Sequence, residues 1–174
     1  RFCWLVSALA FLFFIGFTTS FSKLENHQNR QIVIYSIYKN SAIDFMNGNK
    51  VYSFTNEEMT EKSLEYAVQN YRWSKGIKTE KPFSFSSASL ELDNCLFWKD
   101  NFVQFYNKRL AIVDRDLRST LAKKIVVDYV LIRNNPKISL DNIIQMFDFE
   151  TIIFDASNSK WKVEKWKEES NQLG

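Results

Sequence analysis

The chain has 174 residues, of which 45% are hydrophobic and 16% aromatic, and it carries a formal net charge of +3. This charge is too small to indicate nucleic-acid binding by itself, and four glycines with two prolines argue against long disordered linkers. The two cysteines, Cys3 and Cys95, lie on either side of a sharp change in composition, which excludes a disulfide within the second part.

The first segment, residues 2–21, contains no charged residue and no His, Asn or Gln. A helix of that length spans about 30 Å, the thickness of the hydrocarbon core of a bilayer. We therefore expect residues 1–22 to form a transmembrane helix, residues 23–30 a polar connector and residues 31–174 one domain. A secretory signal peptide is the rival interpretation, but the apolar run is too long for a signal core and no A-x-A-like site follows it.

After the connector, the sequence predicts an antiparallel sheet, because Asn47-Gly48 between two apolar runs favours a hairpin. The expected strands are residues 31–38, 41–46 and 50–54. Apolar residues at helical spacing from Leu64 to Tyr71 predict a helix, which Gly76 ends. Residues 75–87 are polar and contain Pro82, so we expect a loop.

The second half predicts another antiparallel sheet and then a βαβ unit. The expected antiparallel strands are residues 89–98, 102–106 and 110–113. Residues 125–132 are nearly all apolar, as in a strand buried on both faces. Ser139 can cap a helix whose apolar face includes Ile144 and Phe147, with a short strand following at 151–154 and a charged helix at 161–169. These elements favour a layered α/β sandwich over a doubly wound fold.

Carboxylates are the main candidates for chemistry, because the single histidine, His27, lies in the connector. A zinc site needs about three protein ligands, and no phosphate-binding loop or nucleophile motif is present. Strand ends can bring carboxylates together around a hard cation such as Mg²⁺. The candidates are Asp44, Asp114, Asp116 and Asp155. The alternative is that they stabilise turns, as aspartate often does, and residues 155–159 are typical of a self-bonding turn before a helix.

Residues 160–167 mix lysines with two tryptophans, a pattern that can contact DNA. The candidate DNA-binding residues are Lys160, Trp161, Lys162, Lys165 and Lys167. On a helix, Trp161 and Trp166 point about 140° apart, so we expect Trp166 to be buried with Val163 and Trp161 to be exposed. The alternative is a solvated amphipathic helix whose lysine stems cover aromatic rings. A weaker patch of the same kind comprises Lys75, Lys78, Lys81, Tyr71 and Trp73.

Four stretches carry a family resemblance: QIVIYSIYKNSAIDFMNGNKVY, NFVQFYNKRLAIVD, VDYVLIRNNPKISL and IIFDASNSKWKVEKWK. They resemble the C-terminal part of ComEC-type competence proteins, in the form found in Bacteroidetes-like bacteria. The resemblance implies a polytopic inner-membrane protein that moves one DNA strand across the membrane in natural transformation. Residues 2–21 would be the last helix of its channel region. The rest would be an appended metallo-β-lactamase-like domain with αββα layering.

Active members of that family carry an H-x-H-x-D-H metal motif and a later G-H-H-G-S-like stretch. Here the first region has no histidine and the second is replaced by residues 133–137, so only Asp116, or Asp114, matches a family ligand. The resemblance therefore implies a degenerate domain without a metal cofactor or hydrolase activity. Its expected partners are the remaining membrane helices of a longer protein, single-stranded DNA and the lipid bilayer, with the domain on the extracytoplasmic side of the inner membrane.

Two other hypotheses stay open. One is a divalent-metal nuclease that uses the four aspartates. The other is a membrane-tethered interaction module unrelated to DNA.

Overall fold

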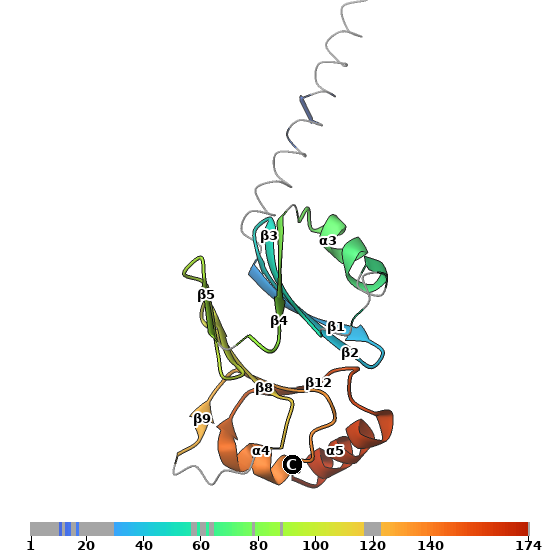
Figure 1. The fold of residues 1–174 in the computed structure, drawn as a ribbon, viewed down its shortest axis with the longest axis vertical. Coiled ribbons are helices and arrows are strands. Elements are labelled where there is room, and N and C mark those ends of the chain that lie inside the picture. Colours follow the sequence, from blue (N-terminus) through green and yellow to red (C-terminus); the bar gives the residue numbers. More distant parts are fainter. Residues whose placement is uncertain are drawn as a thin grey trace, which may run out of the picture.

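The structure is a computed structural model that describes residues 11, 13, 14, 17, 30–56, 59, 62, 65–77, 79–87, 89–116 and 123–173. The strands are β1 (Arg30–Ile37), β2 (Asn40–Asn47), β3 (Lys50–Thr55), β4 (Thr79–Ser84), β5 (Ser89–Leu92), β6 (Leu96–Lys99), β7 (Phe102–Phe105), β8 (Lys108–Val113), β9 (Ile125–Val126), β10 (Tyr129–Ile132), β11 (Phe147–Asp148) and β12 (Thr151–Phe154). The helices are η1 (Glu65–Gln69, a π-helix), α3 (Asn70–Ser74), α4 (Leu140–Met146) and α5 (Lys160–Leu173). The fold is mixed α/β, as predicted (Figure 1).

The first sheet contains β1, β2, β3 and β4 in that order. The first three strands pair antiparallel, which confirms the predicted opening, and Gly48 supplies the left-handed residue of the hairpin turn with a φ of 61°. β4 pairs in parallel with β3, so the prediction of a loop over residues 75–87 is wrong. Pro82 is tolerated in β4 because an edge strand does not need every backbone N–H for its ladder.

A short helix connects β3 to β4 and covers the outer face of the first sheet. Its α3 part ends before Gly76, which has a φ of 66° and is the stop that the sequence predicts. Val68 is buried against Tyr35 and Ala42 of the sheet. The predicted beginning of the helix at Leu64 lies outside the described residues.

The second sheet has the order β12, β10, β8, β7, β6, β5. β5 to β8 form the predicted antiparallel meander, but the expected strand at residues 89–98 is two strands. Asp93 and Asn94 turn the chain there with φ values of 48° and 52°. β8, β10 and β12 run parallel, which confirms the predicted βαβ unit.

The strand predicted over residues 125–132 is interrupted at Asp128, and this prediction needs correction. The two parts join different sheets, because β9 pairs with β11 whereas β10 lies between β8 and β12. At the break, the Asp128 carboxylate accepts the backbone N–H of Arg109 at 2.7 Å and Lys108 Nζ at 2.9 Å. The predicted burial on both faces holds for Val130, Leu131 and Ile132 but is wrong for Val126, which is 49% exposed, and composition did not predict the change of sheet.

The helix after Ser139 begins as predicted and differs in its buried face. Ser139 caps α4 by accepting the backbone N–H of Asn142. Met146 is buried, whereas Ile144 is exposed and Phe147 already belongs to β11. The predicted face is therefore wrong at Ile144 and places Phe147 in the wrong element.

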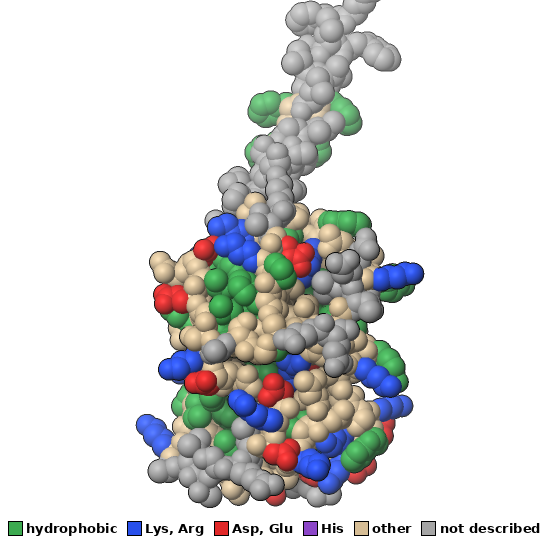
Figure 2. Space-filling model, viewed as in Figure 1, with side chains coloured by type: hydrophobic (Ala, Val, Ile, Leu, Met, Phe, Trp, Pro, Cys, Tyr) green, Lys and Arg blue, Asp and Glu red, His purple; other side chains and the backbone are tan. Residues whose placement is uncertain are grey.

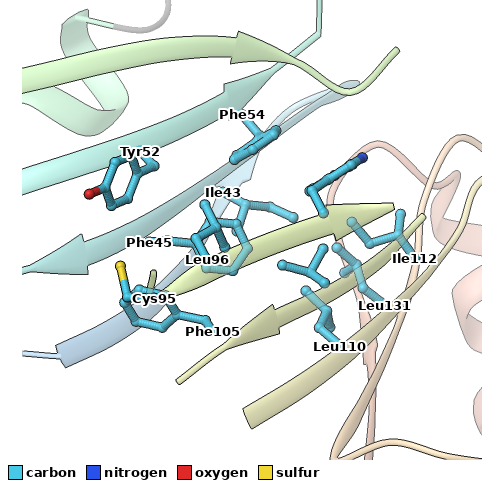
Figure 3. Packing of buried hydrophobic residues seen from close by; sticks show 12 residues of the cluster. Ile43, Phe45, Tyr52, Phe54, Cys95, Leu96, Phe105, Leu110, Ile112 and Leu131 are labelled. Carbon is cyan, nitrogen blue, oxygen red and sulfur yellow. The ribbon is translucent and has the colours of Figure 1, made fainter. Parts of the chain in front are cut away.

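Helices cover the outer faces of two sheets that pack against each other (Figure 1). The core between the sheets joins Phe45 and Phe54 of the first sheet to Leu96 of the second (Figure 3). Phe54 also stacks on Trp98 with ring centroids 4.3 Å apart. The described residues thus form four layers in the order helix, sheet, sheet, helix.

The predicted transmembrane helix lies almost wholly outside the described residues. Phe11, Phe13, Phe14 and Phe17 are described, and they are helical and between 61% and 78% exposed. Within the described part of the chain, no helix is both long enough and apolar enough to span a membrane.

A buried ion pair fastens the helical layer to the first sheet. Arg72 of α3 donates from Nε and Nη2 to the two carboxylate oxygens of Asp44, both at 2.7 Å. The Tyr35 hydroxyl donates to the same carboxylate at 2.8 Å. Burial lowers the pKa of Arg72, but the hydrogen bonds and charge of Asp44 outweigh it and raise the pKa overall.

Arg72→Ala should lower the free energy of unfolding by about 3–5 kcal/mol, because it leaves the Asp44 carboxylate buried and unpaired. Urea unfolding of the chain in a mild non-ionic detergent, followed by tryptophan fluorescence, measures the loss. The double variant Asp44→Leu/Arg72→Met removes both charges and should recover most of it. A loss below about 1 kcal/mol in the single variant is typical of exposed pairs and would contradict this arrangement.

Asp128→Asn should destabilise the protein at neutral pH and progressively less as the pH falls. The hydrogen bonds from Lys108 and from the Arg109 backbone lower the pKa of Asp128. This carboxylate therefore stabilises the folded chain above its unfolded pKa of about 4, and the contribution is lost as the pH falls through the lower folded value. Urea unfolding of both proteins from about pH 7 to about pH 3.5 gives the difference. A difference that does not change with pH would count against this role.

Candidate functional site

A polar pocket opens where the carboxyl ends of several strands meet. The parallel strands β8, β10 and β12 are followed by Asp114, Arg133 and Asp155. In the first sheet, the parallel strands β3 and β4 end next to Asn56 and Phe85. The pocket between these ends has a volume of about 490 Å³, and its lining includes Lys39, Asn56, Phe85, Asp114, Arg133 and Asn134.

One wall of the pocket rests on the turn formed by residues 155–159. Asp155 Oδ1 accepts the backbone N–H of Ser157 at 3.1 Å and the Ser157 hydroxyl at 2.5 Å. Asn158 Nδ2 donates to the same oxygen at 3.2 Å and to the Ile132 carbonyl, at the end of β10, at 2.7 Å. These bonds fit the self-bonding turn that the sequence suggests as the alternative to a metal ligand.

The same turn holds loops from both sheets. The backbone N–H of Asn134 donates to Ser157 Oγ at 2.8 Å. From the first sheet, the backbone N–H of Lys39, in the β1–β2 turn, donates to the Ala156 carbonyl at 3.0 Å. The turn therefore fixes the distance between the two sides of the pocket.

The loop after β10 has an unusual backbone. Asn134 and Asn135 both adopt left-handed conformations, with φ values of 60° and 53°. Asparagine tolerates this region better than most residues, but two in succession are uncommon. Asn135 Oδ1 accepts the backbone N–H of Ser159 at 2.6 Å and its hydroxyl at 2.9 Å. These bonds hold the bend that follows Arg133.

Arg133 lies in the pocket wall and is only 3% exposed. Its Cζ atom lies 3.6 Å from the centroid of the Phe85 ring, and Nη2 donates a short hydrogen bond to Asn56 Oδ1. Nε and Nη1 are buried and have no hydrogen-bond partner among the described residues. Burial lowers the pKa of the guanidinium, opposed by the charges of Asp114 and Asp155, yet an arginine side chain stays protonated in proteins.

The structure does not gather the four candidate aspartates into one site. Asp44 pairs with Arg72 in the outer layer of the first sheet. Asp114 Oδ1 accepts Asn101 Nδ2 at 2.9 Å, and Asp116 Oδ1 accepts the backbone N–H of Lys137 at 2.7 Å. Among the described residues there is no group of three or more His, Cys, Asp or Glu that could hold a metal ion.

Asp155 stabilises its own turn, and its carboxylate interacts with the charge of Arg133. Burial raises its pKa, and hydrogen bonds from Ser157 oppose this shift. The pocket lining itself holds two cations, Lys39 and Arg133, against the single carboxylate of Asp114. Its electrostatics therefore favour an anion over a divalent cation.

The basic candidates on α5 divide between the surface and a structural role. Lys162 Nζ donates to the Asn135 carbonyl at 2.5 Å, and burial lowers its pKa. Lys160 and Lys165 each lie 3.8 Å from a glutamate one turn further along the helix, and Lys167 is exposed. Figure 2 shows basic and acidic side chains interspersed over the visible face of the domain.

The weaker basic patch is separate from the pocket. Lys75 and Lys81 lie over the rings of Tyr71 and Tyr52 at 5.5 Å and 5.9 Å. Trp73 is exposed, and position 78 lies outside the described residues.

A second cavity, of about 450 Å³, lies between the sheets near the start of β8. Its lining is mainly apolar, with Ile32, Ile34, Phe105 and Leu110 among the residues. Arg30, Asn107 and Lys108 also line it. The polar pocket is the stronger candidate because it lies at the carboxyl ends of parallel strands, where ligands bind in α/β sheets.

Of the residues that line this pocket, the sequence singles out only Asp114 as a functional candidate, and Arg133, Asn56, Phe85 and Lys39 are among those that it misses. Nothing near Arg133 in the sequence signals that it is buried beside a phenyl ring from the other sheet. The available signal is its position, because residues directly after parallel strands often contact ligands. Arg133 directly follows the parallel strand β10 and precedes Asn-Asn-Pro, so its position indicates a contact with a ligand.

The two tryptophans of α5 differ as predicted. Trp166 is 2% exposed, stacks on Phe154 with centroids 5.4 Å apart and donates from Nε1 to the Ile138 carbonyl at 3.0 Å. Trp161 is 63% exposed. One tryptophan therefore belongs to the core, and the other is available at the surface.

Trp166→Ala should lower the free energy of unfolding by about 3–5 kcal/mol, since it empties a packed site. Trp161→Ala is the matched control and should change it by less than about 0.5 kcal/mol. Urea unfolding of both variants followed by circular dichroism gives the comparison. Equal effects of the two substitutions would contradict the assignment of faces.

A family model described as the ComEC C-terminal domain matches residues 32–174. Comparison with curated proteins and with solved structures gave no match. The matched range includes both sheets, the polar pocket and the turn over residues 155–159.

Proposed function

This chain belongs to the ComEC C-terminal domain family, and we propose that it serves as an accessory, non-catalytic domain of a competence protein, where it contacts the DNA that is taken up. Family membership supports the link to DNA uptake. The observation that carries the accessory role is Arg133, a buried cation in the wall of the strand-end pocket. A cation at this place disfavours binding of a second cation such as Mg²⁺.

The proposal includes a degenerate metallo-β-lactamase-like fold. The four layers of helix, sheet, sheet and helix support it. In the resemblance, residues 133–137 stand where active members carry a G-H-H-G-S-like stretch, and in this structure they form the bend beside the pocket. The pocket would thus occupy the place of the family's metal site, with arginine and asparagine side chains instead of imidazoles.

The proposal also places the domain at a membrane. Residues 1–22 would be the last helix of the channel region, and the domain would lie on the extracytoplasmic side of the inner membrane. The apolar sequence supports this, as do the exposed phenyl rings of Phe11, Phe13, Phe14 and Phe17, since such rings need lipid or other helices around them. The expected partners remain the other membrane helices of a longer protein, the bilayer and single-stranded DNA.

The chain, in a mild detergent, should bind single-stranded DNA at low salt and leave it intact in Mg²⁺ or Mn²⁺. Fluorescence anisotropy with a labelled oligothymidine measures binding, and the logarithm of the affinity should fall with the logarithm of salt by about 0.7 for each phosphate contacted. Gel analysis of the same samples tests for cleavage.

Two results would contradict the proposal. Absence of binding to both single-stranded and double-stranded DNA at low salt would leave only a structural role. Metal-dependent nicking that disappears in Asp116→Ala, with Asp148→Ala as the matched control outside the pocket, would instead indicate a nuclease.

A further inference from the structure

The guanidinium of Arg133 is held in place with most of its donors unused. An arginine side chain has five N–H donors, and Arg133 uses Nη2 toward Asn56 while Nε and Nη1 have no partner in the described part of the chain. A buried donor without a partner is costly, typically by about 1–3 kcal/mol. A group of this kind beside a pocket needs an explanation, and a bound ion is one that native structures provide.

The position of Arg133 is fixed before any ligand arrives. The Phe85 ring covers one face of the guanidinium, and Phe85 is itself held against Trp98, with centroids 5.9 Å apart. The backbone N–H of Arg133 donates to the Val113 carbonyl at 2.9 Å. Little conformational freedom remains to be lost on binding, which favours affinity.

The charges around the pocket select the sign of the ligand. Lys39 and Arg133 line it, and the carboxylate that lines it, Asp114, already accepts a hydrogen bond from Asn101. Asp155 does not line the pocket and is bonded within its own turn. An oxyanion in the pocket would be stabilised by the positive charges of Arg133 and Lys39, and phosphate is the anion that arginine commonly binds.

Exposed aromatic rings flank the same edge of the domain. Tyr38, next to Lys39 in the β1–β2 turn, is 80% exposed. The Lys39 backbone is bonded to the turn that leads into α5, and exposed Trp161 lies in the first turn of that helix. Unpaired bases stack on such rings, whereas the bases of a duplex are already stacked and paired. This favours a single strand as the source of the phosphate.

We infer that the Arg133 pocket binds one backbone phosphate of single-stranded DNA, with Arg133 as the main contact and Lys39 at the rim. This inference rests on the proposed role in DNA uptake and adds the site and the chemical group that it binds. The recessed position of Arg133 requires a backbone that can bend toward it, which a single strand does more easily than a duplex.

The main experiment uses the full chain in detergent and two variants. Asn56→Asp places a carboxylate against Arg133 without changing the size of the side chain, and Arg133→Met removes the cation. Arg109→Met is the matched control, because it removes an exposed arginine at the opposite end of β8 from Asp114. Isothermal titration calorimetry with inorganic phosphate at constant ionic strength measures the affinity of the pocket for the anion. Fluorescence anisotropy with labelled oligothymidine and with a duplex of equal length shows which form of DNA supplies the phosphate.

We expect the parent chain and Arg109→Met to bind phosphate and to prefer the single strand. Asn56→Asp should weaken both ligands about tenfold or more, because the added carboxylate offsets the charge of Arg133 and repels an anion in the pocket. If Arg133→Met does not fold, the binding data for Asn56→Asp alone test the site.

Three outcomes overturn the inference. The first is that the parent chain does not bind phosphate beyond the effect of chloride, in which case Arg133 only balances Asp114 and Asp155. The second is that Asn56→Asp binds the single strand as the parent does, which leaves the proposed function standing without this site. The third is phosphate binding without DNA binding, which removes the proposed function as well.

Discussion

The turn over residues 155–159 is the constraint on which the pocket depends. It is short, polar and partly buried, so its polar atoms must find partners inside the protein. The Asp155 carboxylate accepts the backbone N–H of Ser157 within the turn. Ser157 Oγ accepts the backbone N–H of Asn134, in the loop after β10, and the Ala156 carbonyl accepts the backbone N–H of Lys39. Loops from two different sheets are thus tied to one point. The turn sets the width of the pocket without contributing a side chain to its lining.

Arg72 and Arg133 are both buried, but only the charge of Arg72 is paired with a bonded carboxylate. Arg72 is bonded to Asp44 at 2.7 Å, to Ser53 at 2.6 Å and to Glu80 at 2.6 Å, so its charge and most of its donors join α3 to the first sheet. Arg133 is equally buried but has an amide partner and a phenyl ring in place of a bonded carboxylate. Arginine is suited to both tasks, and the surrounding groups decide which one it performs.

Local patterns predicted much of the fold and little of the site. The Asn47-Gly48 hairpin, the Ser139 cap and the buried face of Trp166 depend on neighbours in sequence, and all three are confirmed. The strand containing Pro82 and the break at Asp128 depend on pairing with distant segments, so composition misled there. Arg133 depends on the meeting of three chain segments that carry Phe85, Asn56 and the bend at Asn135. No window of sequence contains that combination.

The geometry of the strand ends is independent of the chemistry placed on them. Two packed sheets with parallel strands bring their carboxyl ends to a shared edge whatever side chains follow, because strand direction and sheet order are set by the apolar core. In the resemblance, histidines at such an edge hold metal ions. In this chain the same kind of edge carries Arg133 and Lys39, and Asp155 is directed into a turn. On the proposed function, the chemistry of the pocket changes through the residues at the strand ends, and the layers that form it stay intact.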